Sequence, residues 1–84
     1  MLTPDQSSLL VAVYLHDSAG VSYLITELAE QHARIIESLL QRDLVERDSP
    51  QDQDIGAIHF IAYRTTPVGR ALAAVLLQQR EGSS

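Results

Sequence analysis

Two threonine–proline pairs, Thr3-Pro4 and Thr66-Pro67, constrain the fold of this chain most strongly. Threonine is a favoured N-cap residue and proline suits the first helical position, so each pair predicts the start of a helix. Gln6 stands where a capping box requires Glu or Gln. Because the chain has 84 residues, the two helices bracket a single domain, 1–84, with one thin core.

The segment 22–43 carries apolar residues at helical spacing. Ser22 predicts the N-cap of a short second helix, with Leu24, Ile25 and Leu28 on its inward face. A third helix is expected from about residue 31 to residue 42, with Ile36 and Leu39 among its buried residues. No Gly or Pro separates the two helices, so one continuous helix over 22–42 is the alternative.

Two strands are predicted over 44–47 and 55–64, joined by the polar segment 48–54 into a hairpin. The expected fold is therefore mainly α with a small β-hairpin (α+β), in the order α-α-α-β-β-α. This order is that of a winged helix-turn-helix. Its helix-turn-helix covers about 22–43, its wing about 44–64, and its C-terminal dimerisation helix about 67–80.

Two segments of the chain resemble bacterial transcription regulators of the MarR and PadR type. Residues 39–47, LLQRDLVER, resemble the end of their recognition helix and their first wing strand, and residues 63–72, YRTTPVGRAL, are similar to the segment after the wing. The resemblance covers roughly residues 9–77. It implies a winged-helix fold, DNA binding and dimerisation through terminal helices. The chain departs from these families at Asp43, where they usually have glycine, and in its acidic wing.

The polar face of the third helix is the predicted DNA-reading surface. Arginine pairs bidentately with guanine and glutamine with adenine in the major groove of double-stranded DNA, and serine contacts bases or phosphates. The candidate DNA-binding residues are Gln31, His32, Arg34, Ser38, Gln41 and Arg42. The alternative interpretation is that this face is only the solvated side of an amphipathic helix.

The charge of the chain argues against non-specific binding of nucleic acid. Eleven acidic residues face six arginines, there is no lysine, and the formal net charge is -5. Five of the acids and one arginine fall within residues 43–54, so phosphate should repel the wing. A small homodimeric transcriptional regulator would then read DNA with its third helix alone. The alternative function is a winged-helix protein–protein interaction module whose acidic wing binds a basic partner.

The last helix is apolar on nearly all sides, which predicts a homodimer because so small a core cannot bury every side. We expect Val68, Leu72 and Leu76 to pack inward. The predicted dimer-interface residues are Ala71, Ala74, Val75 and Leu77. Such a dimer would present two third helices to half-sites roughly 34 Å apart.

Several other functions are not expected. The absence of cysteine excludes disulfides and a cysteine nucleophile. The three histidines, His16, His32 and His59, lack metal-ligand spacing, so we expect neither metal nor cofactor. There is no nucleophile elbow or glycine-rich phosphate loop, so we predict no enzymatic activity. No apolar run approaches the roughly 20 residues that span a bilayer, and residues 1–5 do not resemble the start of a signal peptide. We therefore expect a cytoplasmic protein without membrane contact.

Overall fold

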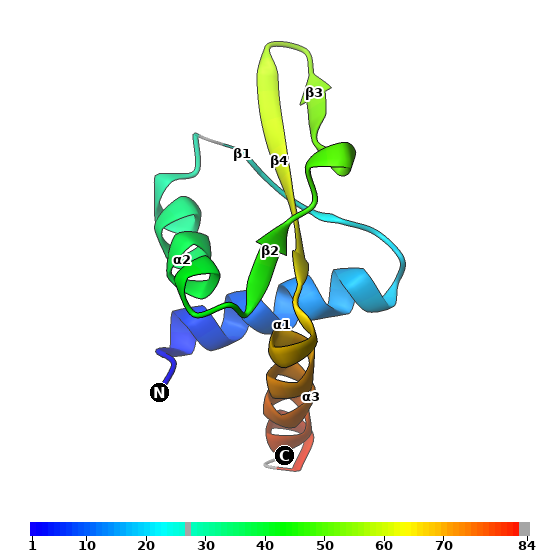
Figure 1. The fold of residues 1–84 in the computed structure, drawn as a ribbon. Helices are drawn as coiled ribbons and strands as arrows, with labels where there is room; N and C mark the ends of the chain where they lie inside the picture. The colour runs from blue at the N-terminus through cyan, green and yellow to red at the C-terminus, as the bar shows by residue number, and fades with distance from the viewer. Residues whose placement is uncertain (27, 83–84) are drawn as a thin grey trace.

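The long strand β4 (Ile58–Thr65) is the centre of the fold (Figure 1). In the computed structural model, which describes residues 1–26 and 28–82, β4 pairs antiparallel with β1 (Tyr23–Thr26) along one edge. Along its other edge it pairs with β2 (Val45–Arg47) and then with β3 (Gln53–Ile55). With three α-helices, the chain is an α+β domain with a small antiparallel sheet.

Both helices that begin at a threonine–proline pair form as predicted. Helix α1 (Pro4–Ser18) has the full capping box, in which the backbone N–H of Gln6 donates to Thr3 Oγ1 at 3.1 Å and Thr3 N–H donates to Gln6 Oε1 at 2.9 Å. Helix α3 (Pro67–Gly82) begins after Thr66, whose Oγ1 accepts from Gly69 N–H at 3.0 Å. The predicted starts at residues 4 and 67 are therefore confirmed.

The predicted second helix is wrong, and so is the order α-α-α-β-β-α. Residues 23–26 form β1, so that the chain runs α1, β1, α2 (Glu30–Gln41), β2, a 3-10 turn η1 (Ser49–Gln51), β3, β4 and α3. The physical reason lies in β4, whose backbone N–H and C=O groups need partners along both edges of the strand. The aromatic and β-branched residues of β1 meet that need, with Tyr23 opposite Tyr63 and Ile25 opposite Ile61.

The predicted hairpin is present and is more regular than expected. Part of the polar segment 48–54 forms η1 and β3, and the strands β3 and β4 turn at Gly56, which has a φ of 63°. Ile55 and Ile58 face each other across this turn. The β3–β4 hairpin projects away from the helices (Figure 1).

The core lies between α1, α2, the sheet and the first half of α3. Helix α1 crosses the fold beneath the sheet, and α3 continues from β4 across α1 (Figure 1). Fully enclosed side chains include Leu10 and Val13 of α1 and Leu39 of α2. The buried cluster comprises Leu9, Leu10, Val13, Ile25, Ile36, Leu39, Leu44, Val45, Tyr63 and Ala73.

Helix α3 is rotated relative to the predicted packing. Val68, which was expected to pack inward, is 60% exposed, and Val75, a predicted interface residue, is 48% exposed. The side that faces the core instead carries Gly69 and Ala73, because small residues allow α3 to approach the rest of the fold closely. Leu72 and Leu76 are half-buried against the edge of the core.

Candidate nucleic-acid interface

Helix α2 carries all but one of the predicted DNA-binding residues, and Arg42 follows as its C-cap. Ile36 and Leu39 anchor the helix because both lie in the core, at 2% and 0% exposure. The apolar positions recur at helical spacing and leave the opposite side in solvent. The helix is thus an amphipathic element held on one face, as its sequence predicts.

Five of the six candidate residues lie on the surface. The side chains of Gln31, His32, Arg34, Gln41 and Arg42 are all exposed. Within residues 1–26 and 28–82, none of these side chains has a hydrogen-bond or ion-pair partner. Their polar groups are therefore available to a ligand.

Ser38 differs from the other five candidates. It is half-buried, its hydroxyl donates to the backbone carbonyl of Ile35 at 2.6 Å, and it accepts from Gln6 Nε2 at 3.0 Å. Gln6 is also part of the α1 capping box, so this one side chain joins the start of α1 to the middle of α2. Ser38 fixes the position of the helix and is not free to contact a ligand. The sequence predicts the capping role of Gln6 but not its contact with Ser38, because the two residues are 32 positions apart in the chain.

The arginines fall into two groups. Arg47 donates to Asp52 at 2.9 Å, Arg64 to Glu46 at 2.8 Å, and Arg80 to Ser8 at 3.1 Å. The remaining three are exposed, and their guanidinium groups have no partner in the described part of the chain. They are Arg34, Arg42 and Arg70. Two of these three belong to α2 or its C-cap.

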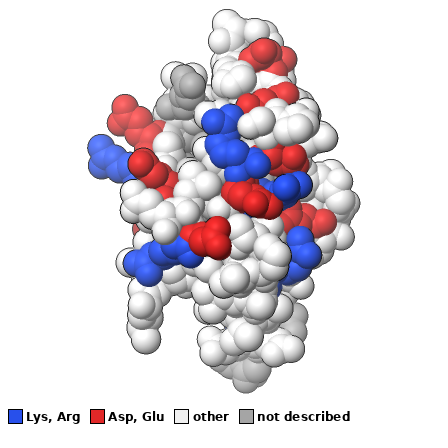
Figure 2. Space-filling model, in the orientation of Figure 1, with Lys and Arg blue, Asp and Glu red and all other residues white. Residues whose placement is uncertain are grey.

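Two glutamates share the exposed face of α2 and were missed by the sequence analysis. Glu30 lies four residues before Arg34 and Glu37 three residues after it, so all three project on one side of the helix. With Arg42, the formal charge of this helix and its C-cap is zero. Figure 2 likewise shows acidic and basic side chains interleaved, without a continuous basic surface. The spacing of the two glutamates from Arg34 in the sequence was enough to place them on the same face of the helix.

Three acids of the hairpin have side-chain partners within the hairpin. Glu46 pairs with Arg64, and Asp54 Oδ1 lies 2.6 Å from His59 Nδ1. Asp52 accepts from the backbone N–H of Ala62 at 2.7 Å as well as from Arg47. The bond from Ala62, assisted by Arg47, holds the pKa of Asp52 below its ordinary value. The hairpin is thus held by hydrogen bonds and ion pairs that its composition does not reveal.

The turn from α2 into β2 sets the angle between the helix and the hairpin. Asp43 has a φ of 58°, in the left-handed region that favours glycine. Its carbonyl oxygen accepts from Thr66 Oγ1 at 2.6 Å, while the carbonyl of Leu44 accepts from Thr66 N–H at 3.1 Å. The segments that carried the family resemblance therefore meet at this turn.

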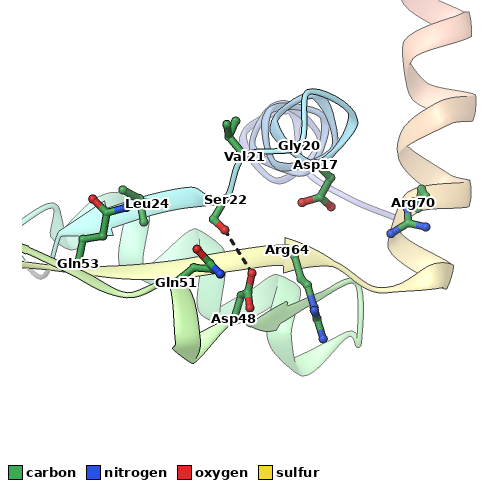
Figure 3. A pocket seen from close by; sticks show the side chains of 10 residues that line it. All are labelled: Asp17, Gly20, Val21, Ser22, Leu24, Asp48, Gln51, Gln53, Arg64 and Arg70. Atoms are coloured by element: carbon green, nitrogen blue, oxygen red, sulfur yellow. Dashed lines mark hydrogen bonds between the residues drawn. The ribbon is translucent and has the colours of Figure 1, made fainter.

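A polar groove lies on the side of the hairpin base, where α1, β1, β4 and α3 come together (Figure 3). Its volume is about 550 Å³ and both signs of charge line it. Asp17 is half-buried there and accepts from Thr65 through both the backbone N–H, at 2.8 Å, and the hydroxyl. Ser22 Oγ donates to Asp48 at 3.2 Å across the groove. The α2 candidates do not line this groove.

The predicted dimer-interface residues are only partly exposed. Ala71 and Val75 are exposed, whereas Ala74 and Leu77 are half-buried. Val68, at 60% exposure, lies three residues before Ala71 and seven before Val75, on the same stripe of α3. The exposed apolar stripe is therefore Val68, Ala71 and Val75.

The described residues, 1–26 and 28–82, contain no cluster of three or more His, Asp or Glu side chains placed to hold a metal ion. In the same part of the chain, no helix has both the length and the apolar character needed to cross a membrane. Comparison with family models, curated proteins and solved structures yields no match to the chain.

Proposed function

We propose that the protein is a small winged-helix regulator that reads double-stranded DNA with α2 and acts as a homodimer, without catalytic activity. One observation carries this proposal. Five exposed side chains on α2 and its C-cap have no partner among residues 1–26 and 28–82, whereas the arginines of the hairpin are paired with acids. Such a regulator would act in the cytoplasm.

The free side chains are of the types that recognise bases. Arg34 suits a guanine and Gln31 or Gln41 an adenine, since each offers two hydrogen-bonding atoms to one base edge. From residue 31 to residue 41 a helix rises about 15 Å, and base pairs stack about 3.4 Å apart. Helix α2 is therefore long enough to contact about four base pairs. Ser38 keeps a positioning role through Gln6.

The charge distribution favours binding by base contacts over binding by phosphate contacts. Glu30 and Glu37 flank Arg34, so α2 lacks the excess of positive charge that drives non-specific binding. The hairpin carries exposed Asp54 and is not basic enough to lie on phosphates. We therefore expect few phosphate contacts and a shallow dependence of affinity on salt.

A second copy of the chain is the proposed partner of α3. The stripe formed by Val68, Ala71 and Val75 is apolar and carries no charge. If two α3 helices pair antiparallel, Val68 of one copy faces Val75 of the other, and the Ala71 side chains lie near the middle of the contact. The small Ala71 side chains would let the two helices approach closely. This pairing revises the predicted interface: Ala71 and Val75 stay, and Val68 joins them.

The turn at Asp43 supports membership of the MarR and PadR type. A left-handed residue is needed there, and these families usually supply glycine. Gly69 of the segment TPVGR packs against the same turn. The two segments that resemble these families, 39–47 and 63–72, are thus in contact with each other in the folded chain.

Selection of tight-binding duplexes from a random pool tests the function. The wild-type protein should enrich a two-fold symmetric site with half-sites one helical turn apart. A pool that remains random after repeated selection would refute DNA reading.

The hairpin tip favours a second candidate function, a protein–protein interaction module. Ile55 and Ile58, which pair at the end of the hairpin, are 57% and 40% exposed, and the preceding Asp54 is exposed as well. A partner with a basic, partly apolar surface would suit this tip. Loss of such a partner on replacing Asp48, Asp52 and Asp54 by asparagine would support this alternative.

A further inference from the structure

A second groove, apolar in character, is lined by residues from the start of the chain and of α1, from the C-cap of α2 and from α3. Its volume is about 610 Å³, which is within the range of small-molecule sites. It shares no lining residue with the polar groove at the hairpin base. Of its lining residues, only Arg42 belongs to the predicted DNA-reading surface.

The apolar part of this groove is entirely aliphatic. Leu2, Leu72 and Leu76 line it and are half-buried, and Leu44, at 6% exposure, lines it as well. The remaining apolar lining residue is the exposed Met1. No aromatic side chain is among the described residues that line the groove, so no ring is present on which an aromatic ligand could stack. The wall therefore suits an aliphatic chain.

One charged side chain, that of Arg42, lines the same groove. Arg42 is exposed, and its guanidinium group has no partner among residues 1–26 and 28–82. Asp43 follows it in the chain but does not line the groove. The other polar lining residues, Ser7 and Gln79, are neutral. The groove thus combines an aliphatic wall with one unpaired positive charge.

We propose that this groove binds an aliphatic acid, with its chain against the leucines and its single anionic group on Arg42. A guanidinium presents two parallel N–H donors to a carboxylate, and burial of the chain removes apolar surface from water. The net charge of -5 repels anions at long range, so a preference for an acid has to arise at Arg42 itself. Binding at this groove requires neither DNA nor a second copy of the chain.

Octanoate is the probe, and three matched compounds each change one of its properties. 1-Octanol lacks the charge, octylamine reverses it, and butanoate has a shorter chain. Backbone amide signals of the full-length protein, without DNA, are followed by NMR during titration of each compound. We expect saturable shifts with octanoate at Ser7, Leu44 and Leu76, and binding about tenfold or more weaker for each matched compound.

Substitution of Arg42 tests the anionic end. Arg42→Gln should bind octanoate no better than 1-octanol, whereas Arg42→Lys keeps the charge and should retain a preference for octanoate. Arg70→Gln removes one positive charge at an exposed position that does not line this groove. This control should keep the full wild-type preference, although its net charge equals that of Arg42→Gln.

Two neighbouring glutamines of α3 provide a second matched pair. Gln79 lines the groove and Gln78 does not, and both are exposed. Gln79→Glu places a negative charge beside the anionic group of the ligand, so octanoate should bind several-fold more weakly. Gln78→Glu adds the same charge outside the groove and should bind octanoate as the wild type does.

The absence of saturable shifts with octanoate, or shifts centred on other exposed apolar residues such as Ile55, would overturn the proposal. A folded Arg42→Gln variant that keeps the wild-type preference for octanoate over 1-octanol would also overturn it. Groove signals that shift on dilution of the ligand-free protein but do not respond to octanoate would show that a second copy covers the groove instead.

Discussion

Gly69 in the first turn of α3 packs directly against the backbone carbonyl of Leu44. A Cβ atom at position 69 would lie 1.7 Å from Leu44 O and 2.7 Å from its carbonyl carbon. The same carbonyl accepts from the backbone N–H of Thr66 at 3.1 Å. Helix α3 is thereby fixed to the turn that joins α2 to the hairpin.

Replacing Gly69 by alanine should destabilise the protein by about 2–4 kcal/mol, because backbone atoms, which cannot move aside alone, occupy the space. Urea unfolding followed by circular dichroism measures the change. Gln78→Ala, at an exposed position of the same helix, should change the free energy of unfolding little. A Gly69→Ala variant as stable as Gln78→Ala would contradict this close contact.

Replacing Asp43 by glycine should stabilise the protein by about 0.5–1 kcal/mol, because its φ of 58° is strained for a residue with a Cβ atom. Asp43→Val should have the opposite effect, since β-branched residues tolerate this region least. The two variants form a matched pair for urea unfolding. Equal stability of both would show that the backbone at this turn is not left-handed.

Lowering the pH should weaken the stabilisation that Asp52 provides through its bonds to Arg47 and to the backbone of Ala62. Its pKa is lowered in the folded state, so its contribution is complete above its ordinary value of 3.8 and is lost as the pH falls through the lower folded value. Asp52→Asn should therefore be less stable than wild type at neutral pH, and the gap should narrow at about pH 3. Urea unfolding at both pH values measures the gap. A gap that is constant with pH, as expected for Glu37→Gln, would contradict the prediction.

The sequence predicts most of the helices, because their signals are local. Thr3, Pro4 and Gln6 make the capping box that they indicate, and Ile36 and Leu39 fall on the buried side of α2. The strand β1 could not be found this way. Its apolar residues fit a helix equally well, and only pairing with β4, nearly 40 residues away, decides between the two.

In the candidate site, too, the local features follow from the sequence and the long-range contacts do not. Exposure of Gln31, Arg34 and Gln41 follows from helical spacing, and the structure agrees. The engagement of Ser38 depends on Gln6, which lies on another helix, and the outward rotation of Val68 depends on the contact of Gly69 with Leu44. Such long-range contacts leave no periodic trace in a single sequence.

Replacing Val75 by aspartate should convert a homodimer to a monomer, because the charge would be buried at the apolar stripe of α3. Sedimentation equilibrium at micromolar concentration measures the mass. Arg70→Gln, at an exposed position on another side of α3, changes the charge by the same one unit and should remain dimeric. A wild-type protein that sediments as a monomer would rule out this dimer.

The affinity ratio between a selected duplex and a shuffled duplex tests the central claim, base reading by α2, most directly. Wild type, Arg34→Ala and Arg70→Ala are compared at one salt concentration, with circular dichroism to show that each is folded. We predict that Arg34→Ala lowers the ratio about tenfold or more, since a bidentate contact discriminates by that order, and that Arg70→Ala leaves it unchanged. A ratio that Arg34→Ala leaves intact, or that both variants lower equally, would contradict the account.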